Sequence, residues 1–383
     1  MITDLRPQPK VLFVLFGGDV MGGSERLVYT LAVELARLGL RPVLACFGEK
    51  AFKEYYDLGC PVYILQKRNR FDVAAIRRLA HLIRDEKIDV VNAHHFMPFL
   101  YSFLASKVLT QTPLVYTEHS IWEIERLSAF WRSIGRYLFR RIDAVVGVSP
   151  VITNRLQQMF GLNDGVATTI PNGVELNVSA TGKYILSRRD LGVADSDILI
   201  AMVANFKAIK NHLFLLRSFY EVSQQISQPV KLVLIGGHFP GLPEDTYPEV
   251  QRFIQSHGLA EKVILLGYRS DVPQLLALVD VFCLTSFREG LPISVLEAMS
   301  AALPVVGADV DGIREVVIPG ENGVLVPSDD VAKLTSALMT LINNKKLRLA
   351  FGAKSKQMAS RYSREECVQR YFSLFRSRAK VPT

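Results

Sequence analysis

The sequence has few cysteines and no long apolar segment. Its 383 residues include only four cysteines, at positions 46, 60, 283 and 367, and no two of them have the C-x-x-C spacing of a metal or redox pair. We therefore expect reduced thiols in a cytoplasmic protein. No apolar run approaches the roughly 20 residues that cross a bilayer. Residues 1–10 carry charges and two prolines where a signal peptide would be apolar.

Two nucleotide-binding motifs are also absent from the sequence. It contains neither the G-x-G-x-x-G fingerprint of dinucleotide-binding sheets nor the G-x-x-x-x-G-K-[ST] phosphate loop. Their absence disfavours a NAD-dependent enzyme and a P-loop nucleotidase. The formal net charge of +8 is shared about evenly by the two halves of the chain. No segment therefore stands out as a nucleic-acid-binding domain, and we expect no nucleic-acid partner.

What the sequence does contain is a regular alternation of short apolar runs and amphipathic segments. The apolar runs are residues 11–16, 42–46, 62–65, 89–93, 114–117, 144–148, 198–203, 231–235, 263–266, 281–284 and 304–306. The segments between them have helical periodicity, as in residues 24–38, where leucines recur at spacings of three and four. Buried strands that alternate with helices predict parallel sheets with right-handed crossovers.

The alternation pauses between Pro171 and Val193, a stretch with Asn-Gly, Ser and Thr, and then starts again. A chain of this length also exceeds one typical core. We therefore predict an α/β protein with two Rossmann-like domains, whose parallel sheets face each other across a ligand cleft. The expected bounds are residues 1–175, residues 176–362, and residues 363–383 for a last helix. Ligands of such sheets bind at the carboxyl ends of the strands.

A glycine-rich loop, residues 17–25, follows the first predicted strand and opens a helix. Glycines let backbone N–H groups approach a ligand closely, and a helix N-terminus attracts anions. Gly22 and Gly23 are thus candidate contacts for a phosphate or an acceptor. The alternative is a tight turn in which Ser24 caps the helix.

Histidines follow the fourth and fifth predicted strands, at His94 in Asn-Ala-His-His and at His119 in Thr-Glu-His. Neutral imidazoles there could hydrogen-bond sugar hydroxyls or a diphosphate. A structural role at a strand end is the alternative for each. The occurrence of two such motifs favours a functional role for His119, and less so for His94. No carboxylate or cysteine falls at ligand spacing, so we predict no metal site.

Two lysines, Lys207 and Lys210, follow the first predicted strand of the second half. Lysines three residues apart before a helix can reach the same anion, and an ammonium group stabilises the charge of a diphosphate leaving group. A solvated basic loop is the alternative. Asp309 and Asp311 form a D-x-D string, which can hold Mg²⁺ in other sugar transferases. Their place in a short loop favours a polar lining of the cleft without a metal.

The segment from Glu289 to Met299 carries the sharpest motif. Pro292 suits the first turn of a helix, which places Glu289 in the preceding loop and Glu297 just over one turn inside. Two such carboxylates can contact both ends of one polar ligand, whose phosphates would face the N–H groups at the helix start. The alternatives are a capping role for Glu289 and a surface position for Glu297, although the apolar neighbours of Glu297 argue against the latter.

Taken in order, these features resemble the retaining GT-B glycosyltransferases called group 1 or family 4. The resemblance covers nearly the whole chain, at Gly-Gly-Ser-Glu-Arg (22–26), Thr-Glu-His (117–119), Asp-Ala-Val-Val-Gly-Val-Ser (143–149), Ile-Pro-Asn-Gly-Val-Glu (170–175), Leu-Ile-Gly-Gly (234–237), Leu-Gly-Tyr-Arg-Ser-Asp-Val (266–272), Glu-x7-Glu (289–297), Pro-Val-Val-Gly (304–307) and Asn-Gly-Val-Leu-Val-Pro (322–327). Each piece is modest evidence, but the ordered set is specific.

The resemblance implies transfer of a sugar, with anomeric retention, from a nucleotide-diphosphate donor. UDP-sugar is the first choice, the acceptor is a polysaccharide or lipid-linked glycan, and no metal or cofactor is expected. The resemblance also implies that Lys210 binds the diphosphate, that Glu297 holds the ribose hydroxyls, and that Glu289 and His119 lie near the sugar. It assigns three backbone positions to the sugar hydroxyls, namely Gly290, Leu291 and Pro292.

The match departs from the family at one position that bears on the donor. The family often has Gly-Arg where this chain has Ala204-Asn205, and that arginine joins the lysine on the diphosphate. We hypothesise that Lys207 takes its place. Asn205 and Arg269 complete the expected donor-binding set. The last helix of the family usually packs on the N-terminal domain, which we expect for residues 363–383 here.

A basic and aromatic segment from Arg126 to Arg141 predicts an amphipathic helix. Together with the basic residues 67–78 it suggests an acceptor at a membrane surface, since each Lys or Arg near anionic lipid contributes about 1 kcal/mol. We thus expect a peripheral enzyme on the cytoplasmic face, making lipopolysaccharide, capsule or another surface glycan. An ordinary helix with one buried face is the alternative. Rival functions are a sugar-nucleotide epimerase of the same fold, a NAD-dependent Rossmann enzyme and a binding-only homologue.

Overall fold

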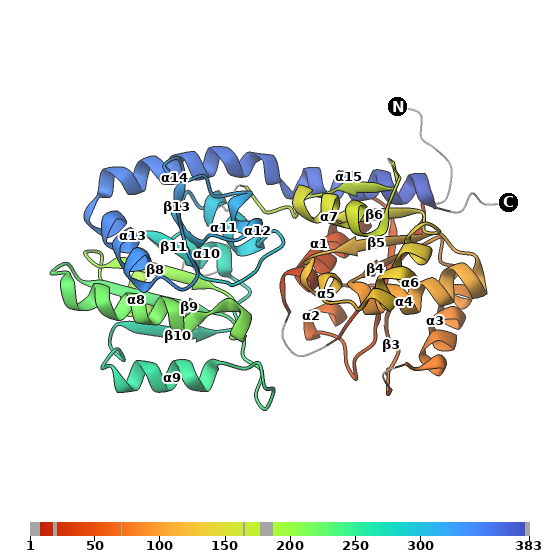
Figure 1. Cartoon of the computed structure of the whole chain (residues 1–383), viewed down its shortest axis with the longest axis horizontal. Helices are drawn as coiled ribbons and strands as arrows, with labels where there is room; N and C mark the ends of the chain where they lie inside the picture. The colour runs from red at the N-terminus through yellow and green to blue at the C-terminus, as the bar shows by residue number, and fades with distance from the viewer. Residues whose placement is uncertain (1–7, 18–20, 70, 164, 177–186, 380–383) are drawn as a thin grey trace. The chain divides into compact units, whose positions relative to one another are not determined.

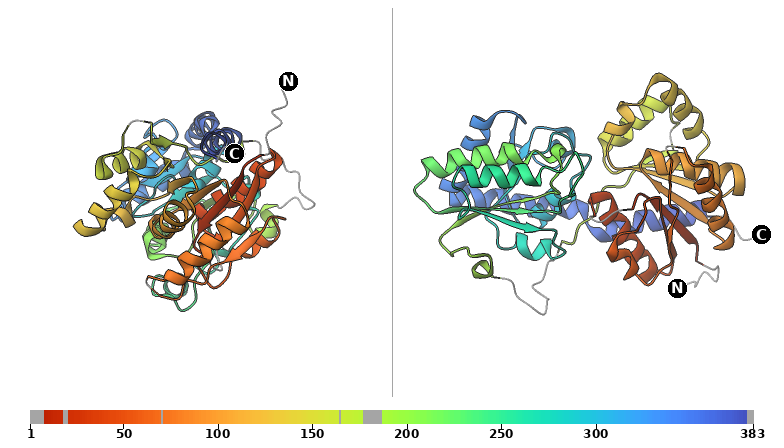
Figure 2. Two further views of the ribbon diagram at one scale, coloured as in Figure 1. Left: turned by 90° about the vertical axis from the view of Figure 1, so that its right-hand side faces the viewer. Right: turned by 90° about the horizontal axis from the view of Figure 1, so that it is seen from below.

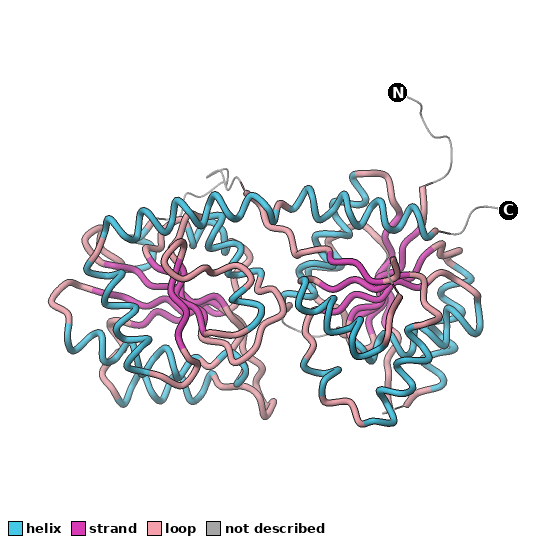
Figure 3. The backbone as a smooth tube through the Cα atoms, turned by 45° about the horizontal axis from the view of Figure 1, so that its top comes forward, coloured by secondary structure: helices cyan, strands magenta, loops and turns pink. Residues whose placement is uncertain are grey.

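The computed structural model describes residues 8–17, 21–69, 71–163, 165–176 and 187–379 (Figure 1). The chain divides into two compact units. Unit 1 comprises Met1–Asn172 and Glu365–Thr383, and unit 2 comprises Gly173–Arg364. In each unit the strands gather at the centre and helices surround them (Figure 3).

Unit 1 contains a seven-stranded sheet in the order β3-β2-β1-β4-β5-β6-β7, with every neighbouring pair parallel. The strands are β1 Lys10–Leu15, β2 Arg41–Cys46, β3 Val62–Ile64, β4 Val90–His94, β5 Leu114–Glu118, β6 Ala144–Gly147 and β7 Ala167–Thr169. The helices are α1 Gly23–Arg37, α2 Lys53–Tyr56, α3 Val73–Asp85, α4 Phe96–Phe103, the π-helix η1 Leu104–Thr110, α5 Trp122–Glu125, α6 Ala129–Phe139, α7 Pro150–Phe160 and α15 Arg364–Arg378.

Unit 2 repeats the same winding with six parallel strands in the order β10-β9-β8-β11-β12-β13. The strands are β8 Ile198–Val203, β9 Val230–Ile235, β10 Val263–Gly267, β11 Val281–Leu284, β12 Val305–Ala308 and β13 Gly323–Val326. The helices are η2 Arg188–Leu191, η3 Ala208–Lys210, α8 His212–Gln225, α9 Tyr247–Ser256, α10 Val272–Leu276, α11 Ile293–Ser300, α12 Asp311–Arg314, α13 Val331–Asn343, α14 Lys345–Ala359 and η4 Ser360–Tyr362. Helices lie on both faces of each sheet (Figures 1 and 2).

The winding reverses at one place in each sheet. The first strand of the unit pairs with the second on one side and with the fourth on the other, so β1 neighbours β4 and β8 neighbours β11. Loops that leave the carboxyl ends of these two strands therefore start side by side, which is where ligands bind in doubly wound sheets. The predicted fold class, two Rossmann-like units with parallel sheets, is confirmed.

The last helix, α15, completes the core of unit 1. Its buried residues Cys367, Val368, Tyr371 and Phe375 belong to the same cluster as the leucines of α1 and the inner side chains of β1. The Phe375 ring meets the Phe13 ring edge-on, with centroids 5.8 Å apart. The apolar side of α15 thus covers the sheet that the N-terminal residues form, and unit 1 needs both ends of the chain.

Two short strands escaped prediction. β7, Ala-Thr-Thr, is partly exposed at the edge of its sheet and has no apolar run. β13 begins at Gly323, a residue that normally weakens a strand. A Cβ atom at this glycine would lie 2.1 Å from the Val305 carbonyl oxygen, so the close approach of β13 to β12 requires glycine.

Two helix starts differ from the sequence interpretation. The segment from Arg126 to Arg141 contains one helix, as predicted, but α6 covers only Ala129–Phe139, because the Ser128 hydroxyl accepts a hydrogen bond from Trp131 N and caps the helix there. Ser24, the alternative cap considered from the sequence, lies inside α1, which begins at Gly23 with Gly22 at the cap position. The expected linker, residues 171–193, includes η2, and its residues 177–186 lie outside the described part. Within the described residues, none of the helices is both long and apolar enough to cross a membrane.

Removing the Phe375 ring should destabilise unit 1. Phe375→Ala leaves a cavity in a fully buried position, which costs about 3–5 kcal/mol for an aromatic side chain. Urea denaturation followed by hydrogen exchange should show the loss in unit 1. Leu349→Ala on α14 is the control, because that side chain is 65% exposed and should change little. Equal stability of Phe375→Ala and the parent would contradict the packing described for α15.

Candidate functional site

The candidate residues of unit 2 meet at the reversal between β8 and β11. Lys210, at the end of η3, places its Nζ 2.6 Å from Oε1 of Glu289. The lysine side chain is 26% exposed and the glutamate 9%. The two residues lie 79 positions apart in sequence, so only the strand order brings them together. Their charges are therefore held at one point of the ligand-binding edge of the sheet.

Hydrogen bonds to backbone carbonyl oxygens hold the loop after β8 and the loop after β11 in fixed positions. Thr285 follows β11, and its Oγ1 lies 3.3 Å from the carbonyl oxygen of Lys210 and 3.1 Å from that of Asn211. Phe287 N donates to the Ile209 carbonyl at 2.9 Å. Asn211 adopts a left-handed backbone (φ 54°), which asparagine tolerates well, and its amide donates to the Ser328 carbonyl at 3.2 Å. These bonds set the position of the lysine before any ligand arrives.

The loop that carries Glu289 is supported from below by α12. A Cβ atom at Gly312 would lie 2.5 Å from the Gly290 carbonyl oxygen and 2.6 Å from that of Glu289. Only glycine lets the start of α12 approach this backbone so closely. The segment Gly290-Leu291-Pro292 is buried, and Pro292 takes the cap position, one residue earlier than predicted.

Glu297 lies in the second turn of α11 and is half-buried, between the fully buried Leu296 and Ala298. A simple surface position, the alternative considered from the sequence, is therefore wrong. Its role on the ribose hydroxyls stays a prediction.

The other donor-binding candidates have local partners. Asn205 Oδ1 accepts a hydrogen bond from Gly237 N at 3.0 Å, which ties the loop after β8 to the loop after β9. The Lys207 ammonium lies over the Phe239 ring, 4.4 Å from its centroid. Arg269 forms a two-point ion pair with Asp271, at 2.7 and 2.5 Å, which holds the pKa of that carboxyl below its usual range.

The D-x-D carboxylates are both paired with one arginine. Arg314 Nε contacts Asp309 Oδ1 at 2.5 Å, and its Nη1 lies 3.3 Å from Asp311 Oδ1. The guanidinium thus occupies the position between the two acids and lowers the pKa of Asp309. In the part of the chain that the structure describes, no group of three or more His, Cys, Asp or Glu residues could hold a metal ion. Metal independence stays a prediction.

In unit 1, a hydrogen-bond chain joins the ends of β4 and β5. His94 Nδ1 lies 2.8 Å from His119 Nε2, and His94 Nε2 lies 2.8 Å from Asn92 Oδ1. Burial, with the nearby charge of His95 second, lowers the pKa of His94 to about 3. Burial likewise moves the pKa of His119 well below its usual value. Both rings are therefore neutral at physiological pH.

His94 and His119, which the sequence suggested for similar roles, differ in their exposure to solvent. His119 is half-buried just beyond β5, whereas His94 is fully buried with both ring nitrogens bonded. His94 has no surface to offer a ligand, in contrast to the expected contact with a phosphate or acceptor.

Two polar residues of this site had no role assigned from the sequence, Asn92 and Glu118. Glu118 is buried, and its Oε1 accepts hydrogen bonds from the backbone of His119 (2.8 Å) and Ser120 (3.0 Å). Tyr116 donates its hydroxyl to the other carboxylate oxygen. Asn92 interrupts a strand of apolar residues, and a buried amide within such a run is the signal that could have indicated a bonded network.

Gly22 and Gly23 lie at the N-terminus of α1, as predicted for the glycine-rich loop. Gly22 N donates to Glu25 Oε2 at 2.9 Å, and Gly23 is the exposed first residue of the helix. Residues 18–20 of the same loop lie outside the described part of the chain. Contact of these glycines with a phosphate or acceptor stays a prediction.

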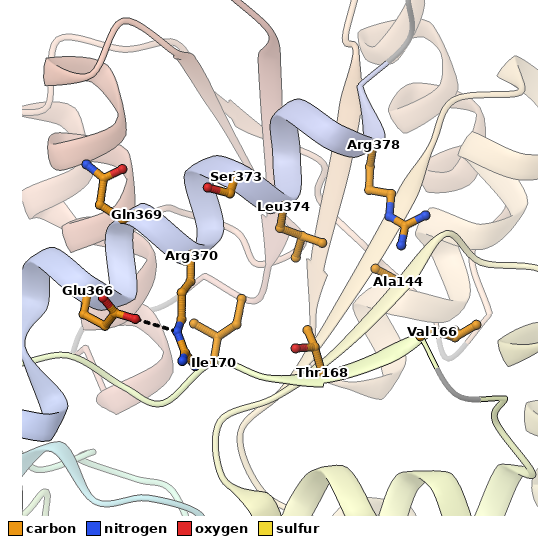
Figure 4. Close-up of a pocket in the computed structure, with 11 residues that line it drawn as sticks. Ala144, Val166, Thr168, Ile170, Glu366, Gln369, Arg370, Ser373, Leu374 and Arg378 are labelled. Carbon is orange, nitrogen blue, oxygen red and sulfur yellow. Dashed lines mark hydrogen bonds and ion pairs between the residues drawn. The ribbon is translucent and has the colours of Figure 1, made fainter.

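Unit 1 also contains a hollow that other residues line. It is about 470 Å³, within the size range of ligand pockets. Figure 4 shows its lining side chains, which come from α15 on one side and from β6, β7 and the segments next to β7 on the other, with Arg370 paired to Glu366. None of the candidate site residues contributes to it.

Comparisons with known proteins decide the family. The sequence profile described as "Glycosyltransferase Family 4" matches residues 21–178, and the profile "Glycosyl transferases group 1" matches residues 185–358. Together the two matches span most of both units. The chain belongs to the group 1 and family 4 glycosyltransferases. The resemblance seen in the sequence is thereby confirmed, and the protein is an enzyme that transfers sugars.

Two solved structures of similar fold cover nearly all of this chain. Anabaena HepE (Alr3699), crystallised with UDP-glucose, has a TM-score of 0.82 at 24% identity, covering 96% of this chain and 99% of that one. Sucrose-phosphate synthase from Thermosynechococcus elongatus has a TM-score of 0.78 at 18% identity, covering 97% and 98%. Both likenesses establish the GT-B fold.

Two curated relatives match most of this sequence. N-acetyl-alpha-D-glucosaminyl L-malate synthase of Bacillus anthracis is 21% identical, over 80% of this chain and 79% of that protein. The UDP-Gal:alpha-D-GlcNAc-diphosphoundecaprenol alpha-1,3-galactosyltransferase of Escherichia coli is 23% identical, over 73% of this chain and 72% of that protein.

The glycosyltransferase should lose stability when the pH falls below about 6.5. Burial lowers the pKa of His94 to about 3 and of His212 to about 4, so these rings gain protons only on unfolding in that window. Each such ring lowers the free energy of unfolding by about 1.4 kcal/mol per pH unit below its unfolded pKa of about 6.5. Urea midpoints measured from pH 7.5 to 5 should therefore decline.

Single histidine variants test the origin of that decline. His212→Gln keeps an amide that can donate to the Ala204 carbonyl, the partner of His212 Nε2, and should flatten the pH slope by one proton. His81→Gln is the control, because His81 is exposed and should leave the slope unchanged. A midpoint that is constant from pH 7 to 5 in the parent would contradict burial of neutral histidines.

Proposed function

We propose that this glycosyltransferase moves a sugar, with retention, from a UDP-sugar to a polysaccharide or lipid-linked glycan. The observation that carries the proposal is the Lys210–Glu289 pair at the sheet reversal of unit 2. The name of the E. coli relative gives it a UDP-galactose donor and a diphosphoundecaprenol-linked acceptor, and the HepE crystals contain UDP-glucose. These names support the choice of donor and acceptor class.

The lysine supplies charge where the reaction develops it. An ammonium group has three N–H donors, and the contact with Glu289 uses one of them in this structure. The other two can donate to oxygens of the donor diphosphate. Their attraction grows as the sugar–phosphate bond breaks and negative charge moves onto the leaving group. Glu289 orients the ammonium and can accept a hydrogen bond from a sugar hydroxyl.

Retention follows from a front-face substitution. The bond from the anomeric carbon to the diphosphate oxygen breaks while the acceptor oxygen attacks from the same side. The proton of the acceptor hydroxyl passes to the departing diphosphate oxygen. Glu289 is paired with a lysine rather than with a second carboxylate, which is unlike the paired acids of retaining glycosidases. This pairing supports a mechanism in which the leaving group is the base.

Lys210→Ala should lower kcat by about 10²–10³-fold, the usual effect of removing one donor to a developing anion. The assay follows UDP release and product from UDP-sugars with lipid-linked acceptor by mass spectrometry, in EDTA because no metal is expected. NMR of the product gives the anomeric configuration. Lys333→Ala is the matched control, since that exposed lysine pairs with Asp330, a neighbour at the start of the same helix.

The possible outcomes separate the proposal from its rivals. Full activity of Lys210→Ala would contradict the role of the lysine. An inverted product would contradict retention. Formation of an altered nucleotide sugar without an acceptor would instead identify an epimerase.

We propose further that α6 binds an anionic membrane surface. Phe130 and Tyr137, two turns apart on one side of the helix, are 67% and 57% exposed. Arginines 126, 132, 136, 140 and 141 are all exposed. The Arg141 guanidinium stacks 3.6 Å from the Tyr137 ring centroid. Aromatic rings flanked by arginines are typical of helices that lie in a lipid interface.

Flotation with vesicles tests this surface. The glycosyltransferase should float with anionic vesicles at low salt and less well at high salt, because charge supplies part of the attraction. Phe130→Ser with Tyr137→Ser should reduce flotation several-fold. Tyr56→Ser is the control, as Tyr56 is equally exposed but lies on α2. Absence of the parent protein from the vesicle fraction would refute the membrane proposal and leave the transferase proposal standing.

A further inference from the structure

The hydrogen-bond chain of unit 1 has a definite direction that starts at Asn92. The Asn92 amide nitrogen lies 3.4 Å from the Val115 carbonyl oxygen and 3.0 Å from Thr117 Oγ1. A carbonyl oxygen can only accept a hydrogen bond, so the NH₂ group must lie on that side. The amide oxygen of Asn92 then faces His94, where it can only accept.

The direction passes from Asn92 to His94. Because Asn92 Oδ1 accepts, the proton of His94 must be on Nε2. Burial keeps His94 neutral, so its other nitrogen, Nδ1, carries a lone pair. That lone pair can accept the 2.8 Å hydrogen bond only from a proton on His119 Nε2.

The geometry of the two rings agrees with such a bond. The ring centroids of His94 and His119 are 5.1 Å apart and the ring planes differ by 22°. This separation is close to the longest that a 2.8 Å contact between ring nitrogens permits, so both nitrogens lie near the line that joins the centroids. The bond therefore runs in the plane of the rings, which is the direction of an N–H proton and of a nitrogen lone pair.

The remaining nitrogen of His119 is then a hydrogen-bond acceptor. With the proton on Nε2 and the ring neutral, Nδ1 carries a lone pair, and it has no hydrogen-bond partner among the described residues. The ring is half-buried, and Glu118 Oε1 holds the backbone amide of His119 at 2.8 Å. The position and the polarity of this nitrogen are both fixed by buried neighbours.

We propose that Asn92 and His94 are positioning residues that fix the tautomer of His119, so that His119 accepts a hydrogen bond from a hydroxyl. Such a nitrogen suits a sugar hydroxyl, which has a proton to donate, and it repels a phosphate oxygen, which has none. The sequence alone allowed either ligand. The inference rests on the proposed function for the identity of the hydroxyl as that of a sugar, but the tautomer itself does not depend on it.

The direct test is NMR of the full-length protein labelled with ¹⁵N-histidine. Long-range proton–nitrogen correlations distinguish the two tautomers, and the seven histidines are few enough to resolve. The His119 signals are assigned by their loss in His119→Gln. We expect protons on Nε2 of both His94 and His119 from pH 6 to 8. A proton on Nδ1 of His119, or a charged ring, would overturn the proposal.

Asn92→Asp should reverse the direction of the hydrogen bonds from residue 92 through His94 to His119, which gives a second test. A carboxylate in place of the amide favours a charged His94 ring, whose Nδ1 then donates. His119 Nε2 must accept, so its proton moves to Nδ1 and the polarity offered to the ligand inverts. An unchanged His119 tautomer in a folded Asn92→Asp protein would contradict a positioning role. Asn163→Asp is the control, since Asn163 is exposed in the same unit.

Binding measurements connect the tautomer to the sugar. Asn92→Asp should weaken UDP-sugar by up to about tenfold, because the sugar hydroxyl must turn from donor to acceptor at His119 Nδ1, and leave UDP alone unchanged. Equal weakening of both ligands would indicate a merely structural effect and contradict the proposal. If the parent protein binds neither ligand while the tautomer is as expected, the proposed function fails and the positioning roles stand.

Discussion

The order of the strands is the constraint on which the site depends. In each unit the chain builds three strands in one direction and then returns to the first strand before building outward on the other side. The loops after the first and fourth strands must therefore begin at adjacent points. Lys210 and Glu289 come from such a pair of loops in unit 2, and His94 is the last residue of the fourth strand of unit 1. Candidate site residues that are far apart in sequence meet because of this strand order.

The ion pair between Lys210 and Glu289 costs hydration free energy, but it orients the ammonium group for an anion. Holding Lys210 and Glu289 largely out of water removes hydration from both groups, and their mutual attraction offsets much of that cost. The pair is thus a weak source of stability. Its value is that the ammonium is already oriented when an anion arrives, so little rearrangement is needed as charge develops. Thr285 and Gly312 serve the same end, because they fix the two loops that carry the charges.

The sequence predicted the α/β class and nearly all strands because buried parallel strands read as apolar runs. It missed β7 and β13, where edge exposure or a required glycine removes that pattern. It also started α6 three residues too early, since charge and aromatic content do not reveal the cap at Ser128. Lys210 and Glu289 were found by their motifs, whereas their direct contact depends on side-chain positions that spacing does not encode. The pairing of Arg314 with both D-x-D acids and the network around Asn92 are of the same kind.

The central claim is that Lys210 and Glu289 act together on one nucleotide-bound diphosphate. A double-mutant cycle with Lys210→Gln and Glu289→Gln, read as UDP affinity by titration calorimetry, measures this most directly. The account predicts that each single change weakens UDP and that the two effects are strongly non-additive, because each residue acts through the other. Additive effects, or UDP binding that neither change alters, would contradict it.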